Sequence, residues 1–144
     1  MFKLIFQFFT ILLIPLVYFL GIFIISYPPF IHWLPINITG LIISFIGLIL
    51  WATSYIYLRG SLSVLPKAKQ LVTTGPYKYF SHPVYLGINL ALFGLSLGSG
   101  SIPGVLYTIL IVIPLNFLRA KTEEKELSKK FGQEYKEYKK RVLF

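Results

Sequence analysis

The sequence contains no cysteine and no aspartate, and its acidic residues are five glutamates. Without cysteine, disulfides, thiolate metal sites and cysteine nucleophiles are excluded. The glutamates all lie in the C-terminal tail, at Glu123, Glu124, Glu126, Glu134 and Glu137. A carboxylate pair or an aspartate–histidine metal centre within the apolar part of the chain is therefore excluded, and we predict no metal site.

Charged residues are also missing from a long N-terminal stretch. Between Leu4 and Leu58 there is no Asp, Glu, Lys or Arg, and 56% of the whole chain is apolar. Such a stretch suits two membrane spans joined by a hairpin better than a soluble core. The first apolar run is longer than the h-region of a signal peptide and lacks a small-residue cleavage site, so we expect a retained span.

Hydropathy predicts an all-α integral membrane protein with about four transmembrane helices. The expected spans are Leu4–Ile25, Ile38–Leu58, Pro83–Leu97 and Pro103–Leu118. Each of the last two is only roughly 23 Å long at 1.5 Å per residue, which is short of a ~30 Å hydrocarbon core. The segment GSGSIP joins them, so we expect a short helical hairpin.

The positive charges predict the orientation of these spans. Lys3 precedes the first span, the tail from Arg119 onward is strongly basic, and the loop between spans two and three contains Arg59, Lys67, Lys69 and Lys78. The two opposite loops carry no Lys or Arg, so the positive-inside rule places both termini and the large loop in the cytoplasm. Topology and anionic lipids account for the net charge of +9, and we expect no nucleic-acid partner.

The tail also shows a helical pattern. Apolar residues recur at spacings of three or four at Leu127, Phe131, Tyr135, Tyr138 and Val142. This pattern predicts a C-terminal amphipathic cytoplasmic helix lying on the membrane. Two further steps of four toward the N-terminus reach Glu123 and Arg119, where the last span leaves the bilayer. These charges would form either a plain i,i+4 salt bridge or the lining of a polar pocket.

The segment GPYKYFSHPVYLG, at residues 75–87, begins the third span. Gly75-Pro76 is typical of a turn, and Pro83 suits the first turn of a helix because its missing N–H costs nothing there. His82 is expected to be held extended by the following proline. The tyrosines of the segment would fit an aromatic belt at the membrane surface. The residues alone leave the function open.

Two blocks of sequence together resemble the isoprenylcysteine carboxyl methyltransferase family, whose wider group includes the membrane phospholipid methyltransferases. They are LVTTGPYKYFSHPVYLG and EEKELSKKFGQEYKEYKKRV. The resemblance covers about residues 62–142, while spans one and two match only as generic membrane helices. It implies one membrane domain, 1–144, in which 1–58 form two generic spans and 59–144 hold the catalytic loop, the hairpin and the tail helix. The chain departs from the family at Ser81, where arginine is usual.

The resemblance implies methyl transfer from S-adenosylmethionine to a lipophilic acceptor at the membrane surface. The expected acceptor is a prenylcysteine-like carboxylate, with a phospholipid amine as an alternative, and membrane lipids are expected partners. By position the cofactor would be held by Lys69, Gln70, Leu71, Val72, Tyr77, His82, Pro83, Val84, Tyr85 and Glu123. Arg119 matches a substrate-contacting arginine, and its guanidinium can bind a carboxylate through two hydrogen bonds.

The residue types suit this chemistry. The faces of Tyr77 and Tyr85 can favour a sulfonium cation, Glu123 can accept hydrogen bonds from an ammonium group or ribose hydroxyls, and the backbone of His82 is expected to bracket the adenine. Two other readings stay open: a nicotinamide-dependent membrane reductase of the steroid-reductase type and a non-catalytic membrane scaffold.

Overall fold

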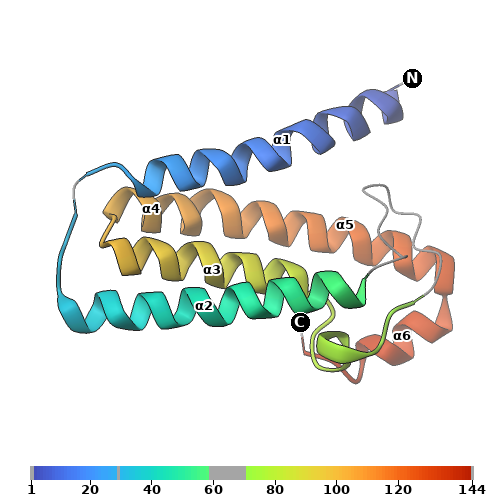
Figure 1. Ribbon diagram of the computed structural model, residues 1–144. Helices are drawn as coiled ribbons and strands as arrows, with labels where there is room; N and C mark the ends of the chain where they lie inside the picture. The colour runs from blue at the N-terminus through green and yellow to red at the C-terminus, as the bar shows by residue number, and fades with distance from the viewer. Residues whose placement is uncertain (1, 29, 59–70, 144) are drawn as a thin grey trace.

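The computed structural model describes residues 2–28, 30–58 and 71–143, with side chains described from residue 13 onward (Figure 1). These residues form the helices α1 (Phe2–Ile25), α2 (Leu34–Tyr57), α3 (Pro83–Ser99), α4 (Ile102–Tyr107), α5 (Ile113–Phe131) and α6 (Gln133–Lys139), with a 3₁₀ turn at Gly75–Lys78. Helices dominate the described chain and no strand is found there, which confirms the predicted all-α class.

Helices α4 and α5 belong to one continuous helix from Ile102 to Phe131. A single π-turn at Thr108–Val112 joins them, and the N–H of Ile113 donates to the carbonyl of Thr108. Pro114 follows immediately and has no N–H for the carbonyl four residues earlier. A wider turn accommodates such a missing donor without ending the helix.

Among the residues whose side chains the structure describes, two helices are long and apolar enough to cross a membrane, by length and composition: α2 and the helix Ile102–Phe131. Large apolar side chains on them are exposed, among them Phe45 and Leu110, as expected for residues facing lipid. The shorter apolar helices Leu13–Ile25 and Pro83–Ser99 coincide with predicted spans one and three, and four crossings stay a prediction. The helix that contains predicted span four begins at Ile102 and continues beyond Leu118 to Phe131.

Helices α2 and α3 pack with their backbones in direct contact. A Cβ atom added to Gly94 would lie 2.3 Å from the backbone nitrogen of Ser44, and one added to Gly47 would lie 2.4 Å from that of Ala91. The hydroxyl of Ser44 also donates to the carbonyl of Ala91 at 3.0 Å. Small residues that allow such an approach are typical of helix pairs in membranes. This contact positions the beginning of α3.

A buried polar chain joins three helices on the other side of α3. The hydroxyl of Tyr18 in α1 donates to Oδ1 of Asn116 in α5 at 2.5 Å. The amide nitrogen of Asn116 in turn donates to Oδ1 of Asn89 in α3 at 2.6 Å. Asn116 is 1% exposed, and in apolar surroundings such a group is costly unless its hydrogen bonds are made. Because Glu123 lies two turns beyond Asn116, this anchor sets which residues of α5 face α3.

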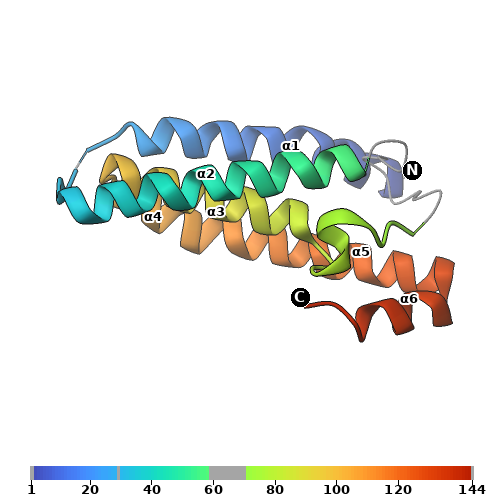
Figure 2. The same cartoon turned by 60° about the horizontal axis from the view of Figure 1, so that its bottom comes forward.

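The tail does not form the single helix that its apolar spacing predicted. Gly132 has a positive φ of 54° and ends α5, and Figures 1 and 2 show α6 turned back beside the end of α5. The hydroxyl of Tyr138 donates to the carbonyl of Tyr77 at 2.7 Å, and the N–H of Leu143 donates to the carbonyl of Tyr79 at 2.8 Å. The tail is therefore packed against the segment that precedes α3.

Candidate active site

The segment before α3 begins with the predicted turn and ends at His82. Gly75 has a φ of 61°, and a Cβ atom there would lie 2.7 Å from the ring of Tyr57, so the turn requires glycine. His82 precedes the first residue of α3, with φ −130° and ψ 57°, and Pro83 occupies the first turn as predicted. The ψ of His82 is not extended, and its carbonyl accepts the N–H of Leu86 at 3.1 Å. The expected extended backbone of His82 is therefore wrong, and the bracketing of adenine by its amide and carbonyl stays a prediction.

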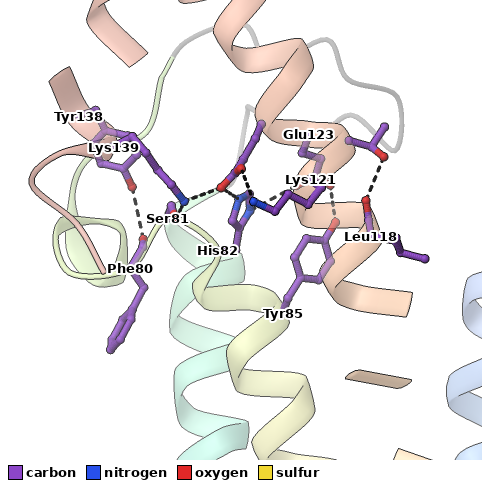
Figure 3. A network of polar contacts seen from close by, with 11 residues as sticks. Phe80, Ser81, His82, Tyr85, Leu118, Lys121, Glu123, Tyr138 and Lys139 are labelled. Carbon is purple, nitrogen blue, oxygen red and sulfur yellow. Dashed lines mark hydrogen bonds and ion pairs between the residues drawn. The ribbon is translucent and has the colours of Figure 1, made fainter. Parts of the chain in front are cut away.

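Tyr85, His82 and Glu123 meet where α3 begins beside α5 (Figure 3). The hydroxyl of Tyr85 donates a hydrogen bond to Oε1 of Glu123. Nδ1 of His82 lies 3.8 Å from Oε2 of the same carboxylate, and the side chain of Glu123 is 42% exposed while that of His82 is 4% exposed. The carboxylate is thus held on one side by buried residues and remains accessible on the other.

Arg119 lies one helical turn before Glu123 and contacts the same tyrosine. Its guanidinium carbon is 5.0 Å from the centroid of the Tyr85 ring, within the range of a cation–π contact. Among the described residues, which include both side chains, no ion pair joins Arg119 to Glu123. The i,i+4 salt bridge considered from the sequence is therefore wrong, and Tyr85 instead contacts both side chains.

A second carboxylate, Glu124, anchors a cluster that sequence reasoning missed. Lys139 of α6 donates to Glu124 and also, at 2.8 Å, to the hydroxyl of Ser81. Oε1 of Glu124 lies 3.4 Å from Nε2 of His82, and Nζ of Lys121 lies 3.7 Å from Oε2. The lysine thus places a cation beside Ser81, the position at which the resembling family usually has arginine. The adjacent glutamates Glu123 and Glu124 were a signal for this cluster in the sequence. The contact with Lys139 could not be predicted, because it forms only when α6 folds back beside α5.

Burial and neighbouring charges shift the pKa values of several side chains in and around this cluster. Burial lowers the pKa of His82 to about 4, although Glu124 opposes the shift, so the imidazole is neutral at pH 7. Burial alone would raise the pKa of Glu124, but the hydrogen bond and charge of Lys139, with His82 and Lys121, lower it. Burial and then the charge of Glu123 raise the pKa of Tyr77. Tyr77 therefore belongs to the electrostatic neighbourhood of Glu123.

The other predicted site residues are distributed as follows. Lys69 and Gln70 lie outside the described residues. Leu71 and Val72 are half-buried in the segment before the 3₁₀ turn, Pro83 is fully buried and Val84 is half-buried at the start of α3. The residues that the fold brings together at one carboxylate are His82, Tyr85, Arg119 and Glu123.

Curated relatives match part of the chain. The human protein-S-isoprenylcysteine O-methyltransferase is 43% identical over 79 residues, and the mouse protein of the same name is 40% identical over 79 residues. Each match covers 50% of this chain and 25% of the relative, so the chain spans only about a quarter of their length. No solved structure matches significantly.

A family model described as phospholipid methyltransferase matches residues 35–134. The match runs from the start of α2 through the start of α6 and includes the cluster around Glu123. Span two, expected to match only as a generic membrane helix, is therefore part of the family pattern. The extent of this match shows that the chain belongs to the phospholipid methyltransferase family.

Proposed function

We propose that this chain is a membrane methyltransferase that moves a methyl group from S-adenosylmethionine to the carboxylate of a prenylcysteine-like acceptor. The observation that carries the proposal is the arrangement around Tyr85, whose hydroxyl binds Glu123 and whose ring contacts Arg119. An anionic group and a cationic group thus lie side by side near the point where the charged part of α5 begins. Membership of the family and the names of the curated relatives support the same reaction class.

The residues present fit the proposed methyl donor. S-adenosylmethionine carries an ammonium group, ribose hydroxyls and a sulfonium cation, and when bound it supplies the methyl group. Glu123 is accessible and can accept hydrogen bonds from the ammonium or the hydroxyls, while aromatic faces such as that of Tyr77 favour a cation. We include Lys69, Gln70, Leu71, Val72, His82, Pro83, Val84 and Tyr85 in the proposed cofactor site by position in the family pattern.

Arg119 is proposed to hold the acceptor's carboxylate. Its planar guanidinium can make two parallel hydrogen bonds to a carboxylate, which would neutralise and orient the nucleophile. An ionised carboxylate needs no general base, and the buried, neutral His82 is compatible with a reaction that moves no proton. The chain's contribution is then alignment of the two reactants and exclusion of water from the nucleophile.

A second acceptor class is favoured by one observation, the match to a family described as phospholipid methyltransferase. In that case the nucleophile would be a headgroup amine, and Arg119 would pair with the lipid phosphate instead of a carboxylate. Methylation of the two acceptors gives different products: a methyl ester from the carboxylate and an N-methyl amine from the headgroup amine. Only the ester is labile to base, so the two products are chemically distinguishable.

The proposal is tested with the full chain reconstituted in neutral lipid nanodiscs. Isothermal titration should detect binding of S-adenosylmethionine and none of NADPH; binding of NADPH alone would instead support a reductase. Labelled methyl groups should appear in a farnesylcysteine analogue as a base-labile product. Transfer only to phosphatidylethanolamine would identify the second acceptor class. Binding of neither ligand, with the helices intact by circular dichroism, would contradict methyl transfer and favour a scaffold.

A further inference from the structure

A groove lined by lysines lies between α5 and α6, next to the site but separate from Glu123. It encloses about 750 Å³ and is lined by Lys121, Glu124, Lys125, Ser128, Lys129, Tyr135, Lys136, Lys139 and Lys140. On α5 the lysines recur every four residues and so share one helix face. Figures 1 and 2 show α6 folded back beside this part of α5, which brings lysines of both helices together.

The positive charge of the groove is poorly balanced. Its only carboxylate is Glu124, which is already paired with Lys121 and Lys139. All five glutamate side chains of the protein lie in the described part of the chain. Within that part, no ion pair involves Lys125, Lys136 or Lys140. Three lysines therefore line the groove without a carboxylate partner among the described residues.

One residue that lines the groove, Tyr135, has a buried hydroxyl that lacks a hydrogen bond among the described residues. Tyr135 lines the groove and is 4% exposed, and in the described residues its hydroxyl oxygen has no hydrogen-bond partner. A buried polar group without a partner is costly and points to a missing ligand. Burial and the charge of Glu124 raise the pKa of Tyr135, so its hydroxyl keeps its proton and is available as a donor.

With the apolar part of the helix Ile102–Phe131 spanning the bilayer, as we predict, the groove lies at the depth of lipid headgroups. Leu118 is the last residue of the apolar part of this helix, and the groove begins at Lys121. At 1.5 Å per residue, Lys121 lies roughly 5 Å and Lys125 roughly 10 Å beyond Leu118 along the helix. The headgroup layer on each side of a bilayer is of order 5–8 Å thick, so these lysines lie in or beside it.

We propose that this groove binds the headgroup of an anionic phospholipid, with the lysines pairing with the phosphate and the Tyr135 hydroxyl donating to one of its oxygens. A phosphate supplies both the negative charge and the acceptor atoms that the groove lacks. The proposed methyl donor does not suit it, because S-adenosylmethionine is a net cation and six lysines would repel it. The groove would hold the tail at the membrane surface beside the site.

The test measures lipid binding to the detergent-solubilised full chain by native mass spectrometry with phosphatidylglycerol and phosphatidylcholine as probes. Replacing Lys125, Lys136 and Lys140 together by glutamine should weaken phosphatidylglycerol binding about ten-fold or more, since each basic residue near an anionic surface contributes substantially. A matched variant removes three exposed charges outside the groove, at Lys78, Lys130 and Arg141. This control should bind phosphatidylglycerol within about two-fold of the unaltered chain, because its groove is intact.

Tyr135→Phe provides a second test that leaves every charge in place. It should weaken phosphatidylglycerol binding about three-fold or more through loss of one hydrogen bond, with unchanged helix content by circular dichroism. Equal losses in the groove and control variants, or equal binding of phosphatidylcholine, would overturn the proposal. Displacement of the lipid by an equal concentration of inorganic phosphate would show that the groove recognises free phosphate. Binding of a polyglutamate peptide in place of the lipid would assign the groove to an acidic protein segment.

The cofactor titration separates this groove from the proposed active site. The triple glutamine variant should bind S-adenosylmethionine as the unaltered chain does. A parallel loss of both ligands would show that the groove is part of the cofactor site and would overturn the lipid assignment. Loss of lipid binding alone supports it, whatever the outcome of the methyl transfer assays.

Discussion

The hydroxyl of Tyr85 donates a hydrogen bond to Oε1 of Glu123, which joins the first turn of α3 to α5. The same ring lies under the guanidinium of Arg119 at 5.0 Å. One tyrosine therefore organises the two charged residues for which we propose different ligands, the cofactor and the acceptor. Variants of the two should differ in which ligand they lose.

Glu123→Gln is expected to weaken binding of S-adenosylmethionine. The substitution keeps the shape of the side chain but removes its charge, and a hydrogen bond to a charged group contributes about 1.5–3 kcal/mol. Isothermal titration measures this loss. Glu126→Gln is the control, since Glu126 pairs with Lys129 further along the helix, and its affinity should not change. Unaltered affinity in a folded Glu123→Gln chain would exclude Glu123 as a ligand.

Arg119→Ala is expected to reduce methyl transfer about ten-fold or more while leaving cofactor affinity nearly unchanged. Each factor of ten corresponds to about 1.4 kcal/mol of transition-state stabilisation. Lysine at position 119 should restore activity only in part, because a point charge does not reproduce the planar fork of arginine. The measurements are initial rates and a cofactor titration on the same samples. A loss of cofactor binding as large as that of Glu123→Gln would mean that Arg119 acts on the cofactor site.

The buried His82 predicts that stability rises with pH between about 4 and 6.5. Its pKa falls from 6.5 to about 4 on folding, so within this range the unfolded chain binds a proton that the folded chain does not. The contribution of His82 to the free energy of unfolding then increases by up to about 3 kcal/mol from the bottom to the top of the window. Burial raises the pKa of Glu123 above 4.5, so this carboxyl acts in the opposite direction as the pH rises from 4.5. The lowered pKa of Glu124 adds stability that is fully present above pH 4.5 and is lost as the pH falls below it.

Thermal unfolding in detergent at a series of pH values measures this dependence. Replacing His82 by glutamine should remove the rise in stability between pH 4 and 6.5, whatever its effect on the absolute stability. A slope that persists in the variant would assign the dependence to another group.

Gly94→Ala is expected to destabilise the pairing of α2 and α3. The added methyl group would lie 2.3 Å from the backbone nitrogen of Ser44, so the helices must separate, at a cost of roughly 1–3 kcal/mol or more. Unfolding in sodium dodecyl sulfate measures the change. Gly21→Ala is the matched control, because its methyl group would meet only the edge of the Tyr107 ring at 3.2 Å. Equal stability of the two variants would contradict the close packing.

We also predict a multi-pass topology with both termini in the cytoplasm, which follows from the basic loop and tail. A reporter that is active only outside the cytoplasm should give a signal when it is fused after residue 100. A reporter that is active only in the cytoplasm should give a signal when it is fused at either terminus. A cytoplasmic signal from residue 100, which lies between α3 and α4, would contradict the four-span arrangement.

Features that depend on neighbouring residues were predictable from the sequence. The absence of charge between Leu4 and Leu58 indicated membrane helices, the pair His82-Pro83 marked the beginning of α3, and the glycines near residue 100 indicated the turn before α4. Arg119 and Glu123 were placed on one helix face because the period of a helix requires it. In each case the physical cause is local: backbone angles, missing donors or helical spacing.

Contacts between distant segments were decided only by the tertiary structure. The apolar spacing of the tail suited one continuous helix, but the positive φ of Gly132 turns α6 back and brings Lys139 to Ser81 and Glu124. Similarly, nothing in a local pattern states that Tyr85 contacts both Arg119 and Glu123 rather than leaving them as a salt bridge. The contacts of Tyr85 depend on the close packing of α2 against α3 and on the rotation of α5, which the buried Asn116 fixes. Both are set by the packing of whole helices, which no local sequence pattern specifies.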